Sequence, residues 1–474
     1  MASCNATAPR PADSDSNTDV ASTGTGLSIP PGKLRPIPTS PPQTPLPLAA
    51  HPPPSQRPTR PPPGVSAVPP PPNGGLTAWL QVLGAFFLMF NTWGLSNTYG
   101  IFQSEYSLTI LSGESESAIS WIGSLQAFLM LLVCVLCGRL LDAGYFYLDI
   151  SLGIFLEIFG MMMTSVATKY WHVILAQGVA VGVGAGMVFI PALQIVGTYF
   201  STRRSTAMGI AATGSGVGGI VYPVLLKRLI ASIGFRWAVR VMAFVMLATL
   251  LVSVAVMKPR RLPVPTKPKA LFSLGAFRDA AFATWLAAIF MVYVGLYIPF
   301  FYVEKYALDI GVSDDLAFYM LIIINVASLP GRVVPSYLAD KLGNLSIMVP
   351  SVLVAGVSIL AWIAADTQEG LITVAFFLGL ASGAIQAVVP GTVVFLCPDL
   401  SMLGTNLGMT LAASGFGLLI GSPVAGVLLD TQLSTAGHSV YWGSFVFAGA
   451  AVLVGCVLMI CVRVIKVGFA IKKA

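Results

Sequence analysis

The sequence predicts an all-α membrane protein whose twelve transmembrane helices form two related halves of six helices each. Hydrophobic residues make up 55% of the 474 residues and charged residues only 9%, whereas about a quarter of an ordinary soluble domain is charged. Apolar windows of about 20 residues, enough to cross a hydrocarbon core of about 30 Å, recur from Ala78 onward. The third observation is an internal repeat with a period of about 200 residues.

Each predicted span is an apolar window between charged or turn-forming residues. The first six windows cover residues 78–102, 118–138, 145–166, 171–198, 205–228 and 236–257. The second six cover residues 279–302, 316–337, 346–365, 370–396, 402–428 and 440–465. These windows divide the chain into an N-terminal half (73–257), a linker (258–278) and a C-terminal half (279–474).

The first 72 residues differ in kind from the rest of the chain. They hold 21 of the 34 prolines, in runs such as PIPTSPPQTPLP, and few aromatic residues. Such a composition cannot bury enough apolar surface to fold, so we expect a disordered tail.

Basic residues in short loops predict the orientation, because cytoplasmic loops are enriched in Lys and Arg. Such residues follow the fourth span (Arg203 and Arg204), the sixth span (258–278) and the last span. The opposite side is rich in acids. We therefore expect both termini in the cytoplasm and a multi-pass protein of the plasma membrane. This bias also accounts for the net charge of +7, so no nucleic-acid partner is expected.

Catalytic and metal-binding patterns are absent from the sequence. Cys134 and Cys137 form a CxxC pair, but they lie in an apolar span without a histidine or a second pair nearby. There is no phosphate-binding loop, catalytic triad or paired-carboxylate site. We therefore expect neither an enzyme nor a bound cofactor, and no metal.

The internal repeat is carried by matching residues in the same span of each half. Asp142 follows the second span and Asp340 the eighth, 198 residues later. Gly182 and Gly186 correspond to Gly379 and Gly383, and the GSG at 214–216 is paired with the GFG at 415–417. Such parallel repeats occur in transporters of the major facilitator type.

Two segments carry a closer resemblance. YFSTRRSTAMGIAATGSGVGG (199–219) resembles the helix-five signature of the monocarboxylate porter family of the major facilitator superfamily, and NGGLTAWLQVLGAF (73–86) resembles its helix-one signature. The likeness covers residues 73–474 and is closest to the fungal branch. That branch includes carriers of small carboxylates and of riboflavin, and proteins thought to export secondary metabolites.

The resemblance implies the major facilitator fold and a secondary active transporter of an organic, anionic small molecule in the lipid bilayer. Export of a secondary metabolite is the first expectation. The alternatives are proton-coupled uptake of a monocarboxylate or of a vitamin such as riboflavin, and a non-transporting sensor of solute.

Charged residues at the cytoplasmic ends of the spans are the expected gate. In the superfamily an acid in the loop after the second or eighth span pairs with basic residues when the inner side is closed, and the matching residues here are Asp142 and Asp340. The other gate candidates are Arg139, Arg203, Arg204 and Lys341.

Arg332 is the sharpest candidate for binding the solute. It stands eight positions before Asp340, about 12 Å into the eighth span, where an unpaired guanidinium costs on the order of 2.5–3.5 kcal/mol. In the resembled family an arginine at this place binds the substrate carboxylate. The carboxylate carriers pair it with an aspartate one turn earlier and carry a lysine in helix one, where this chain has Ser328 and Asn97.

Other polar side chains at membrane depth are candidates for lining the same site: Asn97, Asn91, Gln126, Gln194, Asn325 and Gln386. Glu157 is the one acid well inside a span, which makes it the candidate for carrying a proton. Tyr99, Tyr222, Tyr302 and Trp121 are candidates for stacking on an aromatic solute.

The orientation is open to a direct test. A membrane-impermeant amine reagent should leave Lys267 unlabelled in intact cells and label it after permeabilisation, because residues 258–278 are expected in the cytoplasm. For the same reason the NLS sequon at Asn344 should carry no glycan. Labelling of Lys267 in intact cells would show that the topology is inverted.

Overall fold

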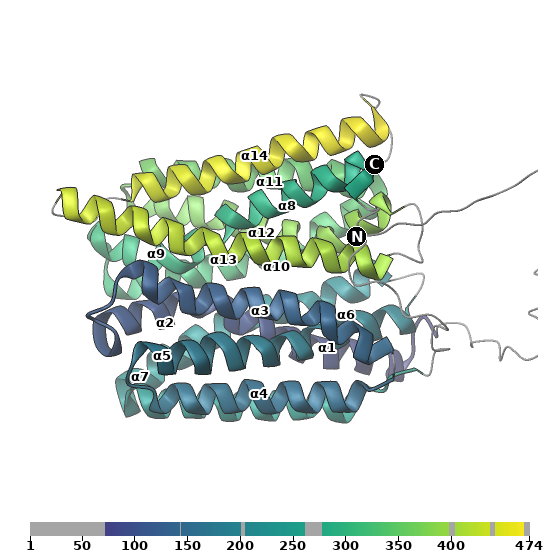
Figure 1. Cartoon of the computed structure of the whole chain (residues 1–474), viewed down its shortest axis with the longest axis horizontal. Coiled ribbons are helices and arrows are strands. Elements are labelled where there is room, and N and C mark those ends of the chain that lie inside the picture. Colours follow the sequence, from purple (N-terminus) through teal and green to yellow (C-terminus); the bar gives the residue numbers. More distant parts are fainter. Residues whose placement is uncertain are drawn as a thin grey trace, which may run out of the picture. The chain divides into compact units, whose positions relative to one another are not determined.

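The computed structural model describes residues 72–142, 144–200, 204–260, 277–397, 403–436 and 441–468. The Pro-rich segment predicted as a disordered tail lies outside this part of the chain, as does most of the linker between the predicted halves. Within the described residues all regular structure is helical, and the long helices run side by side (Figure 1).

The helices fall into two groups along the chain. The first comprises α1 (Leu76–Asn97), α2 (Tyr99–Glu105), η1 (Tyr106–Ile110), α3 (Glu116–Asp142), α4 (Phe146–Val166), α5 (Tyr170–Val173), η2 (Ile174–Val181), α6 (Gly182–Tyr199) and α7 (Arg204–Val256). The second comprises α8 (Ala280–Leu296), α9 (Ile298–Asp309), α10 (Asp314–Leu342), α11 (Asn344–Ala361), η4 (Trp362–Ala364), α12 (Gln368–Leu396), α13 (Leu403–Ala436) and α14 (Trp442–Val467). Asp142 and Asp340 therefore lie in the last turn of a helix and not in the loop after it.

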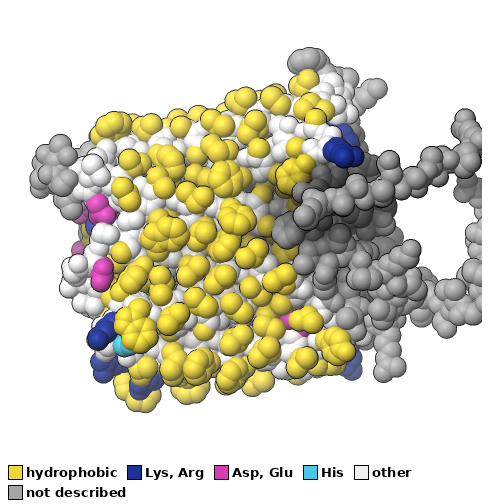
Figure 2. Space-filling view, in the orientation of Figure 1, with side chains coloured by type: hydrophobic (Ala, Val, Ile, Leu, Met, Phe, Trp, Pro, Cys, Tyr) yellow, Lys and Arg dark blue, Asp and Glu magenta, His cyan; other side chains and the backbone are white. Residues whose placement is uncertain are grey.

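Among the described residues, 11 helical segments are long and apolar enough to cross a membrane. Figure 2 shows apolar side chains covering the middle of one face, with most charged side chains near the two ends of the helices. A bilayer solvates this pattern, because its hydrocarbon core accepts the apolar belt and its interfaces accept the charges.

One segment, Thr206–Val256, has 51 residues and covers both the fifth and the sixth predicted spans. At 1.5 Å per residue it would measure about 77 Å, more than twice the thickness of a hydrocarbon core of about 30 Å. Its backbone leaves helical geometry at Gly234, where φ is 77°, a left-handed value that glycine adopts easily. We take Gly234 as the turn between two spans, and the count of twelve stays a prediction.

Four glycines set how the fourth span of each half packs on the second. At each of them an added Cβ would collide with a backbone carbonyl of the neighbouring helix. The pairs are Gly182 with Gln126, Gly186 with Met130, Gly379 with Ile324 and Gly383 with Ser328. Both partners of the first half lie 198 residues before their counterparts, the same separation as Asp142 and Asp340. The internal repeat is thus present in the packing of the helices as well as in the sequence.

Four more glycines pack α7 on α1 and α13 on α8 in the same way. The pairs, again of a glycine with a backbone carbonyl, are Gly214 with Phe86, Gly218 with Phe90, Gly417 with Phe290 and Gly421 with Val294. Gly216 of the GSG segment faces Leu329 of α10, and Gly415 of the GFG segment faces Leu131 of α3. The pairing of the two segments stays a prediction.

The packing of α7 yields a test with a matched control in one helix. A Cβ at Gly218 would lie 2.8 Å from Gly94 Cα, and backbone atoms cannot move aside cheaply, so Gly218→Ala should destabilise the protein by about 1–3 kcal/mol. Gly209 has no atom within 4 Å of its added Cβ, and Gly209→Ala should be neutral or stabilising by up to about 1 kcal/mol.

Thermal unfolding of the purified protein in detergent measures both effects. The melting temperature should fall for Gly218→Ala and stay level or rise for Gly209→Ala. Equal melting temperatures for the two variants would refute close packing of α7 on α1.

Candidate functional site

Two spans, one in each half, are interrupted at equivalent places. Helix α1 ends and α2 begins on either side of Thr98, and α8 and α9 are divided in the same way by Tyr297, 199 residues later. The two residues have similar backbone angles, with φ of −86° and −94° and ψ of −8° in both. Paired interruptions of this kind point to the binding site in membrane proteins built from repeats.

The two interruptions have different local causes. Pro299 lies in the first turn of α9, and its missing N–H cannot continue the hydrogen-bond ladder of α8. No proline lies near Thr98, but its hydroxyl donates to the Gly94 carbonyl oxygen at 2.8 Å. Such bonds to the preceding turn bend helices.

Arg332 of α10 is buried between the halves, with 1% of its surface exposed. Its Nη1 donates to Ser328 Oγ at 2.8 Å and its Nη2 to Gln386 Oε1 at 3.2 Å. A Cβ on Gly216 of α7 would lie 2.7 Å from Nη1, so the N-terminal half reaches the guanidinium as well. Among the described residues no carboxylate forms an ion pair with Arg332. The two hydrogen-bond partners that the structure describes for its guanidinium are both neutral.

An amide pair lies two turns away on the same face of α10. Asn97 Nδ2 of α1 donates to Asn325 Oδ1 at 3.2 Å, and Asn325 Nδ2 donates to the Leu321 carbonyl oxygen at 2.9 Å. Gly219 of α7 allows this approach, because a Cβ there would meet the Asn325 amide. Asn97 Oδ1 and Gln386 Nε2 are buried with no partner among the described residues. Four of the predicted residues, Arg332, Asn97, Asn325 and Gln386, therefore gather where the halves meet.

The other polar candidates lie elsewhere. Asn91 accepts from Tyr222 at 2.5 Å and donates to Thr249 at 3.0 Å, so it joins α1 to α7 within one half. Gln194 is half-buried near Gly138 of α3. Gln126 of α3 is buried, and neither atom of its amide has a partner among the described residues.

Glu157 of α4 is fully buried, and neither carboxyl oxygen has a partner among the described residues. It lies against Gly184 of α6, and α4 packs within the N-terminal half. This position is away from Arg332, and the role of Glu157 in carrying a proton stays a prediction.

The predicted gate falls mostly outside the described side chains. Asp142, Arg139, Arg204 and Asp340 belong to helices whose bounds are described, but their side chains are not, and Arg203 lies outside altogether. Lys341 is exposed, with Nζ 4.4 Å from the centroid of the Tyr337 ring.

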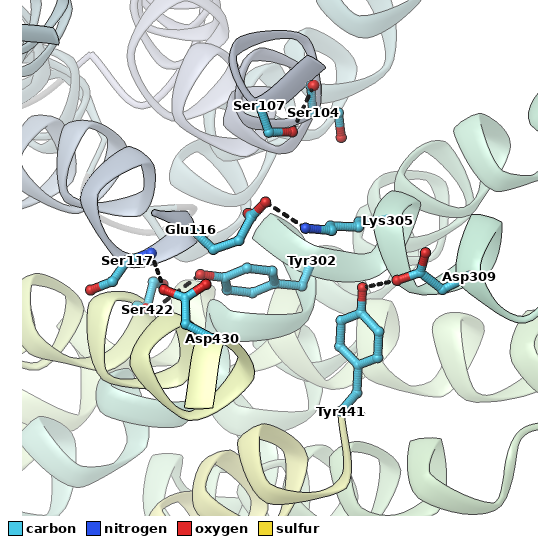
Figure 3. A network of polar contacts seen from close by, with 10 residues as sticks. All are labelled: Ser104, Ser107, Glu116, Ser117, Tyr302, Lys305, Asp309, Ser422, Asp430 and Tyr441. Atoms are coloured by element: carbon cyan, nitrogen blue, oxygen red, sulfur yellow. Dashed lines mark hydrogen bonds and ion pairs between the residues drawn. The ribbon is translucent and has the colours of Figure 1, made fainter. Parts of the chain in front are cut away.

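Sequence reasoning missed a polar network between the halves at the opposite end of the bundle (Figure 3). Glu116 at the start of α3 forms an ion pair with Lys305 of α9. Beside it, Ser117 N donates to Asp430 Oδ2 of α13 at 3.4 Å, and Ser117 Oγ donates to the Pro423 carbonyl oxygen at 3.0 Å. The available signal was a lysine, Lys305, on a side otherwise rich in acids.

The contacts between α7 and α10 change along their length. Near the Lys305 end, Lys227 Nζ of α7 donates to the Asp314 carbonyl oxygen at 3.1 Å. Gly219 and Gly216 touch α10 at the centre, but Gly209, two turns further on the same face, has no neighbour within 4 Å. The described contacts between α7 and α10 thus run from the Lys305 end to Gly216.

The family model described as Major Facilitator Superfamily matches residues 81–368. The chain belongs to the Major Facilitator Superfamily. It is 41% identical to the MFS-type transporter dbaD of Emericella nidulans, over 83% of this chain and 87% of that protein. It is 33% identical to the agnestins efflux protein AgnL12 of Paecilomyces divaricatus, over 83% of this chain and 89% of that protein.

Solved structures support the same fold. A crystal structure of the peptide transporter POT covers 83% of this chain and 97% of its own, with a TM-score of 0.65 and 15% sequence identity. This member of the superfamily is therefore an integral, multi-pass membrane transporter of a small molecule and not an enzyme.

Whether the Glu116–Lys305 ion pair holds the two halves together can be tested, with an ion pair inside one half as the control. Glu116→Gln should destabilise the closed arrangement of the Lys305 end by about 1 kcal/mol, a typical contribution of a partly exposed ion pair. The ratio of molecules open at this end to molecules closed there should therefore rise about fivefold. Lys466 and Asp279, 3.9 Å apart, both belong to the C-terminal half, and Asp279→Asn should leave that population unchanged.

Spin labels at the exposed residues Ser112 and Leu308 report the separation of the two halves at this end. We expect a larger fraction of long distances in Glu116→Gln and a return toward wild type in the swapped pair Glu116→Lys with Lys305→Glu. If Glu116→Gln and Asp279→Asn give the same distances as wild type, the ion pair does not hold the halves together.

Proposed function

We propose that this transporter exports a secondary metabolite that carries an anionic group, and that Arg332 binds that group. The relatives support export, since one of them is named as an efflux protein for agnestins. The observation that carries the assignment is the burial of Arg332 at the junction of the halves, with neutral partners only. A planar guanidinium can offer two parallel N–H groups to a carboxylate.

The amides around Arg332 support the same assignment. A ligand oxygen can accept from Gln386 Nε2, and a ligand hydroxyl can donate to Asn97 Oδ1, two atoms that are otherwise buried without partners. Each such atom costs free energy until a partner arrives. Binding of a polar solute therefore relieves a cost that the free protein carries.

We propose that the chain belongs to the fungal branch of the monocarboxylate porter family and that it lacks the ion-coupling pair of the carboxylate carriers. Ser328 accepts a hydrogen bond from Arg332 at 2.8 Å, where an aspartate would form an ion pair. Asn97 bonds the neutral Asn325. Without ionisable groups at these two positions, proton-coupled uptake of a monocarboxylate or vitamin is the weaker alternative, and Glu157 is the remaining candidate for coupling to protons.

The topology completes the proposal. With both termini cytoplasmic, the Arg204 end of α7 faces the cytoplasm, and we infer that the site loads from this side a solute made inside the cell. The network around Glu116 and Lys305 closes the outer end. Residues 73–257 and 279–474 are then the two units that rock about Arg332, and the plasma membrane is the expected location.

Substitution of Arg332 tests the anion site. In Arg332→Lys the charge remains but the paired N–H geometry is lost, so binding of an organic acid should weaken by about 1–3 kcal/mol. Arg332→Gln should abolish transport of the acid and spare its methyl ester, because only the contact with the charge has gone. Transport into proteoliposomes and direct binding to the purified protein measure the two effects.

Arg240 supplies the matched control. It is a partly buried arginine of α7 that donates to Ser165 at 3.1 Å within the N-terminal half, and Arg240→Gln should change neither substrate. Equal loss of acid and ester in well-folded Arg332→Gln would make Arg332 a structural or gating residue. Binding of the acid without transport by the wild type would favour the sensor.

A further inference from the structure

Four aromatic rings form a row next to Arg332, and the row crosses from one half to the other. Tyr293, Tyr297 and Phe300 belong to the interrupted span α8–α9. Their successive ring centroids lie 6.2 and 5.1 Å apart, with interplanar angles of 19° and 27°. Trp93 of α1 lies 5.9 Å from Tyr297 at 34°. We call these four rings the Tyr297 row. The rings of α8–α9 are stacked in succession and Trp93 is tilted against Tyr297, so the row brings aromatic side chains of both halves together.

The hydroxyl of Tyr297 has no hydrogen-bond partner among the described residues, although 98% of the residue is removed from solvent. Buried tyrosine hydroxyls almost always find a partner. Other buried tyrosines near the junction of the halves do so, since Tyr99 donates to the Ile119 carbonyl oxygen at 2.5 Å and Tyr302 to that of Ser422 at 3.3 Å. The donor on Tyr297 is therefore free for a group that the protein itself does not supply.

The row and the cation belong to one site. Trp93 of the row lies one turn before Asn97, whose amide bonds Asn325 of α10, two turns from Arg332. The hydroxyl groups of Tyr293 and Tyr297 are close enough to Arg332 for an electrostatic interaction. The row also passes through the helix interruption at Tyr297, and the equivalent interruption at Thr98 follows Asn97 directly. The two interrupted spans thus bring the rings, the Tyr297 hydroxyl and the Asn97 amide to the junction of the halves that holds Arg332.

A second aromatic cluster shows what ordinary packing looks like in this protein. Tyr306, Trp362, Tyr441 and Phe445 also lie together, with centroid separations of 5.2–6.4 Å. Its tyrosine hydroxyls are bonded: Tyr306 donates to the Trp362 carbonyl oxygen at 3.2 Å and Tyr441 to Asp309 at 2.5 Å. It lies within the C-terminal half, away from Arg332. The Tyr297 row differs from it, because one hydroxyl of the row has no partner among the described residues and a buried cation lies near.

We propose that the exported solute is a planar aromatic acid whose ring stacks on the Tyr297 row while its anionic group binds Arg332. This inference rests on the anion site proposed above and adds the class of the solute. The hydroxyl of Tyr297 donates to a second oxygen on the ring, such as a phenolic or carbonyl oxygen. A saturated acid of the same size keeps the contact with Arg332 but cannot stack.

Three acids of similar size separate these contributions: 2-hydroxybenzoate, benzoate and cyclohexanecarboxylate. Their dissociation constants are measured on the full-length protein in detergent, which avoids passive crossing of a bilayer by weak acids. The wild type should bind benzoate about threefold to tenfold more tightly than cyclohexanecarboxylate, the range expected for an aromatic pair beyond its buried area. It should bind 2-hydroxybenzoate more tightly still.

Two substitutions of Tyr297 separate the contribution of its ring to binding from that of its hydroxyl. Tyr297→Phe should weaken 2-hydroxybenzoate alone, by about threefold to tenfold, because only a hydrogen bond is lost. Tyr297→Leu should remove the preference for the aromatic acids. Tyr306→Leu, which removes a buried ring of the second cluster in the same interrupted span, should keep that preference. It is the control for general loosening of the fold.

The outcomes distinguish this inference from the anion site on which it rests. If the wild type binds benzoate and cyclohexanecarboxylate equally, including the case in which it binds neither, the ring class is overturned. If Arg332→Gln weakens all three acids while Tyr297→Leu leaves their ratios unchanged, the anion site stands and the stacking role fails. If Tyr297→Leu removes the preference while Arg332→Gln changes nothing, the ring site stands and Arg332 is not the anchor.

Discussion

Contact between helix backbones, with glycine at the point of approach, is the interaction on which the rest of this structure depends. Between helices in lipid the hydrophobic effect contributes little, and close van der Waals packing takes its place. Each glycine costs about 0.5–1 kcal/mol of helix propensity, which the approach of two backbones offsets. Eight such glycines join α3 to α6, α1 to α7, α10 to α12 and α8 to α13 within the two halves. Between the halves, Gly100 and Gly426 meet backbone atoms near the Lys305 end, whereas Gly216 and Gly219 meet side chains of α10.

That difference explains where movement is allowed. Within each half, the backbone contacts fix the distance between paired helices and leave no side chain between them that could change rotamer. Side chains can change rotamer, so the contact of α7 with Arg332 and Asn325 can adapt as the halves tilt. The polar site thus lies at the adaptable part of the junction, with rigid pairs on both sides of it. This arrangement suits alternating access, in which two stiff units rock about a bound solute.

The glycine pattern and the charge of Arg332 could be predicted from the sequence, since both follow from spacing along one helix and from the cost of charge in lipid. Rotation of a helix about its axis could not be predicted. Tyr99, Tyr222 and Tyr302 were candidates for stacking on a solute, and their hydroxyls bond neighbouring helices. Trp121, the fourth candidate, is 39% exposed. The rings that do lie beside Arg332 were missed for the same reason. Glu116 and Lys305 are far apart in the sequence, and no local spacing links them.

The repeat seen in the glycine contacts places Cys134 of α3 opposite Arg332, since the two lie 198 residues apart. Cys134 is buried and donates to the Leu131 carbonyl oxygen at 3.1 Å, so this half offers no cation at the equivalent position. Duplication supplied two copies of the scaffold, and divergence left the charge in one of them. A solute anchored through its anionic end would then stay bound to the C-terminal half, while the N-terminal half moves relative to it. The orientation of such a solute in the site would therefore be fixed on binding, before either end of the bundle opens.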